Sequence, residues 1–233
     1  VQDSSGASTY TKCAADVDVS GNDWRVGGFV GFAEYGQFNN CVAYGDVTSS
    51  VNEPKVGGFM GEDNSDVNAT DCHAAGTVTS ASPDYEAGGF VGTYSGGTLT
   101  DCSFDSEKNP DLNAAGTGTI DSGVTGEESS SVLENICEDY YGGHQYSTEW
   151  TVDTEATCTT SGSKYQACEH CGAKGNITEI PATGHDLTKT EAKEATCTED
   201  GNIEYWYCKN CKKYFSDENA TEEITDVVIY ATG

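Results

Sequence analysis

The chain has 233 residues and carries 11 basic against 39 acidic side chains, a formal net charge of −28. Phosphate binding needs clustered Lys and Arg, so this balance excludes a nucleic-acid partner and argues against an anionic membrane surface. No run of 18 apolar residues occurs, so we expect no membrane insertion. Eleven cysteines and 28 glycines accompany a hydrophobic content of only 36%. This composition predicts an ordered all-β protein with a thin core.

The first element in chain order is a repeat between residues 10 and 105. A glycine-rich motif, Val/Ala-Gly-Gly-Phe-Val/Met-Gly, begins at Val26, Val56 and Ala87, which are 30 and 31 residues apart. Cysteines recur with nearly the same period, at Cys13, Cys41, Cys72 and Cys102. A period near 30 with short strand-like runs and Gly-rich corners predicts a β-solenoid of about four coils, which we place at residues 1–128.

Stacked coils place equal repeat positions in rows. We therefore expect a phenylalanine row of Phe29, Phe59 and Phe90, and a cysteine row whose thiols are packed as small apolar groups. The paired glycines before each Phe allow positive φ or a close approach of two backbones. His73 follows Cys72 directly, and neighbours in a strand point to opposite faces, so we expect His73 to be solvated.

The glycine motif and the cysteine row resemble the GLUG repeat, which occurs in tandem in bacterial surface proteins, including some immunoglobulin A proteases of the zinc metalloprotease type. The resemblance implies an extracellular β-solenoid. It does not imply catalysis in this chain, because no His-Glu-x-x-His, Gly-x-Ser-x-Gly or P-loop sequence is present. We expect no enzyme activity.

Residues 129–143 are expected to form a short capping helix and a linker. Ser131 and Glu134 have the spacing of a capping box, and Gly142-Gly143 supplies a stop. The helix is predicted to lie across the end of the solenoid, with Cys137 as a buried apolar residue.

A second repeat follows, with copies at 144–184 and 185–233. Each copy contains one His, one Cys and then Cys-x-x-Cys. Three thiolates and one imidazole complete the tetrahedral Cys₃His shell of structural zinc, and a module of about 40 residues is too small to depend on a core. We therefore predict two β-hairpin, zinc-ribbon-like modules with two zinc sites: His144, Cys158, Cys168 and Cys171 in the first, and His185, Cys197, Cys208 and Cys211 in the second.

Several alternatives stay open for these modules. Extracellular cysteines often form disulfides, either of a Cys158–Cys171 type or between modules. His170 is an alternative ligand in the first module, and His185 could serve the first triplet, which would leave the second site incomplete. The chain stops where a third copy would begin with His, so we interpret it as a fragment of a longer protein.

Calcium is a weaker alternative cofactor. The segment from Asp16 begins like an EF-hand loop, but its twelfth position is Gly27 instead of Glu, so an EF-hand is rejected. We interpret the other acidic residues as a solvated face, and loosely bound calcium has no positive support.

The second repeat resembles tandem modules that read Gly-His, Ala-Thr-Cys-Thr, Tyr-x-Cys-x-x-Cys and Ile-Pro-Ala-Thr-Gly-His in large secreted surface proteins of gut Firmicutes. The resemblance implies a spacer or zinc-ribbon-like module.

The two repeats together predict a non-catalytic part of a secreted or cell-surface bacterial protein, acting in adhesion or as a spacer. The alternative is an accessory substrate- or glycan-binding region of a larger secreted protease or glycan hydrolase. Candidate contacts for a surface glycan or a host or bacterial protein are Tyr35, Tyr44, Tyr85 and Tyr94.

Overall fold

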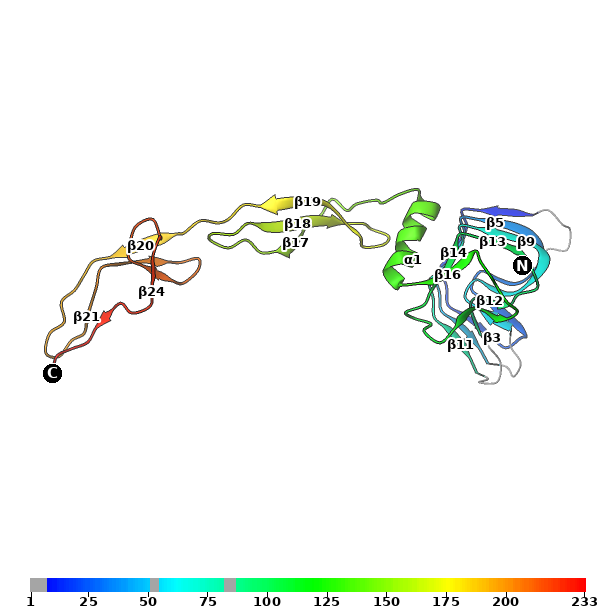
Figure 1. The fold of residues 1–233 in the computed structure, drawn as a ribbon, viewed down its shortest axis with the longest axis horizontal. Coiled ribbons are helices and arrows are strands. Elements are labelled where there is room, and N and C mark those ends of the chain that lie inside the picture. The colour runs from blue at the N-terminus through cyan, green and yellow to red at the C-terminus, as the bar shows by residue number, and fades with distance from the viewer. Residues whose placement is uncertain (1–7, 51–54, 82–86) are drawn as a thin grey trace. The chain divides into compact units, whose positions relative to one another are not determined.

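The computed structural model describes residues 8–50, 55–81 and 87–233. These residues are mostly β-strand with one short helix, which confirms the all-β class (Figure 1). They divide into two compact units. The first holds the described residues up to Gln145 together with Glu169–Ala173, and the second holds Tyr146–Cys168 and Lys174–Gly233. The three borders between the four segments expected from the sequence remain predictions.

The first unit consists of parallel strands that curl into three sheets. The largest contains β1 (Thr9–Thr11), β4 (Arg25–Gly27), β5 (Val30–Asn39), β8 (Lys55–Gly57), β9 (Met60–Thr70), β12 (Gly88–Thr93), β13 (Thr98–Thr100) and β15 (Asn113–Thr117). The second contains β2 (Ala14–Ala15), β6 (Val42–Ala43), β10 (His73–Ala74), β14 (Cys102–Asp105) and β16 (Val124–Glu127). The third contains β3 (Val19–Gly21), β7 (Val47–Ser49) and β11 (Val78–Ser80).

The register of these sheets follows the sequence repeat. Ala15, Ala43 and Ala74 are paired in succession along β2, β6 and β10, and Phe104 of β14 continues their row. In the third sheet the paired row is Val19, Val47 and Val78. Equal repeat positions therefore lie beside one another, as the period of about 30 residues predicts.

The core contains the predicted rows of side chains. The rings of Phe29 and Phe59 stack with centroids 4.9 Å apart, and those of Phe59 and Phe90 with centroids 5.0 Å apart. The cysteine row lies in the same core: Cys41 and Cys72 are fully buried, Cys102 is 1% exposed and Cys13 is half-buried. Burial raises the pKa of Cys72 well above that of an ordinary thiol, which fits a neutral packed group.

The paired glycines permit a close approach of neighbouring backbones and do not adopt positive φ. A Cβ atom on Gly58 would lie 2.3 Å from the carbonyl oxygen of Gly89, in the next sequence repeat. Of the two explanations that the sequence allowed, the structure supports close approach.

Helix α1 (Ser129–Ile136) continues into a π-helical turn, η1 (Cys137–Tyr141), and ends at Gly142 with φ of 78°. Its N-cap is Glu128 and no side chain caps it, so the capping box predicted at Ser131 is wrong. Val132 and Ile136 pack against Val42 and Ala75. The helix therefore covers the outer face of the β6–β10 region, whereas we expected it across the end of the coils.

This position of the helix explains why the prediction for His73 was wrong. His73 points away from the coil interior, as alternation requires, but only 1% of it is exposed. Its Nε2 lies 3.0 Å from a carboxylate oxygen of Asp139 in η1, so the helix covers it.

The second unit is built from short antiparallel strands. One sheet contains β17 (Thr151–Thr154), β18 (Gly162–Ala167) and β19 (Lys174–Ile180). The other two contain β20 (Leu187–Thr190), β22 (Tyr205–Cys208), β23 (Tyr214–Phe215) and β24 (Glu223–Ile224), and β21 (Gly201–Asn202) with β25 (Val228–Ile229). Most of its side chains are exposed or half-buried, so its apolar core is small.

No helix in the part of the chain that the structure describes is both long enough and apolar enough to span a bilayer.

We predict that Gly58→Ala destabilises the first unit by about 1–3 kcal/mol, because the added Cβ forces the backbones of adjacent repeats apart. The exposed residue Thr48 of β7 provides a control, and Thr48→Ala should change the free energy of unfolding by about 0.5 kcal/mol or less. Urea denaturation followed at the backbone amide signals of β9 measures both. Equal stability of the two variants would contradict the close approach of coils at Gly58.

Candidate metal centres

Two sets of three cysteines and one histidine come together among the described residues. In each set the candidate ligand atoms all lie within 4.8 Å of one another. The first set is Cys137, His144, Cys168 and Cys171, and the second is Cys158, His185, Cys208 and Cys211. This confirms the prediction that the chain contains two Cys₃His clusters able to hold a metal ion.

The second set lies wholly within the second unit. Cys208 ends β22, and its carbonyl oxygen accepts a hydrogen bond of 2.9 Å from the N–H of Lys212, which closes the turn of the Cys-x-x-Cys. The Sγ atoms of Cys158 and Cys208 are 3.8 Å apart. The Sγ of Cys211 is 3.7 Å from Nδ1 of His185.

The first set repeats this arrangement. Cys137, His144 and Cys171 belong to the first unit, and Cys168 is the other cysteine of the same Cys-x-x-Cys. The Sγ of Cys171 is 3.2 Å from Nδ1 of His144, and Cys137 is the first residue of η1. In both sets two cysteines are buried and the other two ligands are half-buried, so the two sets present their donors in the same way.

The distances fit a tetrahedral zinc site. Zn–S bonds of about 2.3 Å and Zn–N bonds of about 2.0–2.1 Å require S···S separations of about 3.8 Å and S···N separations of about 3.6 Å. The separations of 3.8 Å and 3.7 Å in the second set match this geometry, and 3.2 Å in the first is slightly shorter. The candidate ligand atoms of each set are three cysteine sulfurs and one imidazole nitrogen. Such donors suit a borderline-soft cation such as zinc better than calcium, which prefers oxygen ligands.

Carboxylates lie behind the first imidazole. Nε2 of His144 is 3.6 Å from Oε1 of Glu138 and 4.0 Å from Oε1 of Glu134, both on the helical segment. Such carboxylates orient a ligating imidazole and raise its basicity. His170 does not join the set, and its ring instead stacks on Tyr141 with centroids 3.6 Å apart.

The thiols of the second set influence one another. Burial raises the pKa of Cys208, but hydrogen bonds from the backbone N–H of Cys211 and from His185 outweigh it, so the pKa is lowered to about 6. Burial and the neighbouring Cys208 and Cys211 raise the pKa of Cys158 to about 11. One thiol of the pair is thus readily ionised while the other resists ionisation, as expected where negative charges share a small space.

The structure groups the ligands differently from our prediction. The sequence predicts Cys158 in the set of His144, but it joins that of His185. Cys137, for which the sequence predicts apolar packing, takes its place in the first set. Cys197 is exposed and joins neither set among the described residues. Each set takes one cysteine from the sequence that precedes its histidine, but Cys137 lies 7 residues before His144 and Cys158 lies 27 before His185, so no common spacing identifies them.

The structure contains none of the alternative disulfides among its described residues. All eleven cysteines lie in the described residues and none of them forms a disulfide. The proposed Cys158–Cys171 pair is also separated by the grouping, because the two residues belong to different sets.

A serine, a histidine and an aspartate form a chain of contacts in the first unit. Nδ1 of His73 lies 2.9 Å from the hydroxyl of Ser103, and Nε2 lies 3.0 Å from Asp139. Both His73 and Ser103 are 1% exposed, so a substrate has no access to the hydroxyl. We interpret the chain of contacts as a polar link between the sheet and the helical segment.

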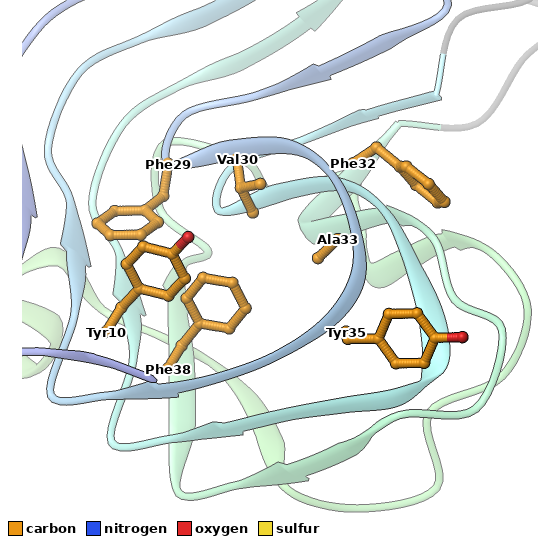
Figure 2. Close-up of a pocket in the computed structure, with 7 residues that line it drawn as sticks. All are labelled: Tyr10, Phe29, Val30, Phe32, Ala33, Tyr35 and Phe38. Atoms are coloured by element: carbon orange, nitrogen blue, oxygen red, sulfur yellow. The ribbon is translucent and has the colours of Figure 1, made fainter. Parts of the chain in front are cut away.

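A small apolar pocket lies beside β5 in the first unit. It is lined by Tyr10, Phe29, Val30, Phe32, Ala33, Tyr35 and Phe38. Figure 2 shows Tyr10, Phe29 and Phe38 gathered inside the curve of β5, with Phe32 on its outer side. The rings of Tyr10 and Phe38 stack with centroids 5.1 Å apart.

The four candidate tyrosines are not equivalent. Tyr35 lines the pocket, whereas the hydroxyl of Tyr44 lies 3.4 Å from that of Tyr141 in η1. The hydroxyl of Tyr94 donates to the carbonyl of Gly97 at 2.6 Å, and Tyr85 lies outside the described residues. Tyr35 is therefore the candidate that the structure associates with a pocket.

The chain was compared with protein-family models, curated proteins and solved structures, and none of the three comparisons gives a significant match.

We predict that Ser103→Ala lowers the stability of the first unit by about 1–3 kcal/mol, because it leaves a buried ring nitrogen of His73 without its partner. Thr100→Ala, at an exposed position of β13, is the control and should have little effect. Thermal unfolding of both variants measures the difference. A Ser103→Ala protein as stable as the control would show that the contact contributes nothing.

Proposed function

We propose that this chain is a non-catalytic part of a secreted or cell-surface bacterial protein, in which a GLUG-type β-solenoid is followed by zinc-stapled spacer modules. The observation that carries the proposal is the pair of Cys₃His sets, each with its ligand atoms within 4.8 Å of one another. The parallel pairing of strands at intervals of about 30 residues supports the solenoid.

Zinc is the metal that best suits these donors. Three thiolates and one imidazole form a closed tetrahedral shell, which leaves no position for water or substrate and is typical of structural sites. The second unit has few buried apolar side chains, so a metal would supply stability that its core does not.

The spacer role follows from the repeats, and adhesion is the more specific form of it. The strongly acidic surface favours solubility and disfavours nucleic acid and anionic membranes. The aromatic pocket lined by Tyr35 has a volume of only about 20 Å³, room for about one water, so a glycan or a protein side chain would contact the rings at its mouth and not enter it. The same aromatic rings are compatible with the alternative function, a glycan-binding accessory region of a larger secreted protease or glycan hydrolase.

We predict that the purified protein binds two equivalents of zinc and that Cys137→Ser binds one. The serine removes a thiolate from the first set and leaves the second set intact. Cys13→Ser, at the half-buried end of the cysteine row, is the matched control and should retain two. Native mass spectrometry after exposure to zinc measures the stoichiometry. Wild-type protein without zinc would refute the metal proposal, and a Cys137→Ser protein with two zinc ions would refute the ligand set.

Adhesion is tested on glycan and host-protein arrays with the wild-type chain and Tyr35→Ala. Binding to a glycan or protein that the Tyr35→Ala variant loses is the expected result, because Tyr35 lines the pocket. Tyr94→Phe, which removes only a hydroxyl bound within the chain, should bind like wild type. Absence of binding above background would remove the adhesive role and leave the spacer.

A further inference from the structure

The second ligand set draws its donors from both copies of the second repeat. Cys158 belongs to the copy at 144–184, whereas His185, Cys208 and Cys211 belong to the copy at 185–233. The second copy therefore supplies three ligands, and the fourth comes from the copy before it. A metal bound here would have one bond to the first copy and three to the second.

The backbone around Cys158 presents its thiol to the following copy. The turn is closed by a hydrogen bond of 2.8 Å from the N–H of Thr157 to the carbonyl of Thr160. The carbonyl oxygens of Thr157 and Cys158 then accept hydrogen bonds from Thr183 and Gly184, the two residues that precede His185. The turn is thus fastened to the point at which the second copy begins.

The thiol enters a small core of the second copy. Cys158 packs with Cys208 and Phe215, and the ring of Phe215 meets that of His185 edge-on with centroids 4.8 Å apart. A hydrogen bond of 3.2 Å also joins the copies, from Nδ2 of Asn210 to the carbonyl of Gly184, but Asn210 is exposed. A metal bound through Cys158 would add a coordinate link between the copies to these contacts.

Cys197 is the equivalent of Cys158 in the second copy and offers a matched comparison. The N–H of Thr196 donates to the carbonyl of Glu199, and the carbonyl of Cys197 accepts from Gly233, so the same turn is formed. Cys197 is nevertheless exposed and outside both sets. The turn alone does not make a ligand set, so the contribution of Cys158 depends on the copy that follows it.

The geometry points to a regulatory role for this metal: it is a junction ion that couples consecutive copies of the repeat, so that metal loading decides whether the two copies move as one body or separately. This inference rests on the proposed zinc-stapled spacer and specifies what its second metal does. A chain of such copies is stiff when loaded with metal and flexible at the junction when metal is removed.

The test uses the full chain loaded with zinc, with native mass spectrometry for stoichiometry and backbone ¹⁵N relaxation for the motion of β17–β19 and β20–β24. We expect wild type and Cys197→Ser to bind two zinc ions and to show one common rotational correlation time for the two copies. Cys158→Ser should bind one zinc ion and show two distinct correlation times. Cys158→His, which restores a nitrogen ligand, should regain the second zinc ion and the common correlation time.

The outcomes separate this inference from the proposed function. Wild-type protein that binds no zinc refutes both. If wild type binds two zinc ions, three results would refute the junction and leave the proposed function intact. These are that Cys158→Ser also retains two zinc ions, that Cys197→Ser loses one, or that the two copies of Cys158→Ser tumble as one body. If the serine variant fails to fold, the comparison of wild type before and after partial chelation decides: a common correlation time that survives loss of the second zinc ion overturns the inference.

Discussion

The convergence of three thiols and one imidazole from separated segments is the interaction on which the C-terminal part of the chain depends. The second unit contains few buried apolar side chains, and three of those that it has are Cys158, Cys208 and Phe215 around one ligand set. Without a cation, thiolates held this close would repel one another, and burial together with the neighbouring Cys208 and Cys211 raises the pKa of Cys158. A divalent metal would remove that opposition and turn the cluster into the main support of the fold.

The first unit gains its core by stacking sequence repeats. Phe and Cys side chains of one repeat are buried against those of the next, and the glycines allow the backbones to approach. Both halves of the chain are thus built from repeats that are incomplete alone and are completed by a neighbour. In the first half the neighbour contributes apolar surface, and in the second half it contributes a thiol.

Much of the fold could be predicted from the sequence because a fixed period determines register: the Phe29–Phe59–Phe90 row and the pairing of Ala15, Ala43 and Ala74 follow directly. The burial of His73 could not, since it depends on where a helix from a distant part of the sequence packs. The grouping of ligands could not be read from spacing either. When copies with His, Cys and Cys-x-x-Cys follow one another, the same sequence is compatible with four ligands from one copy or with one cysteine from the copy before. Cys137 was missed because it precedes the first copy and belongs to a helix.

The connectivity between each metal and its ligands tests the central claim most directly. Zinc can be replaced by an NMR-active cadmium isotope, whose scalar couplings to cysteine β protons identify the thiolates bound to each ion. The account predicts that one cadmium signal correlates with Cys137, Cys168 and Cys171, and the other with Cys158, Cys208 and Cys211. Correlation of Cys158 with the same ion as Cys168, or of Cys197 with the same ion as Cys208, would contradict it.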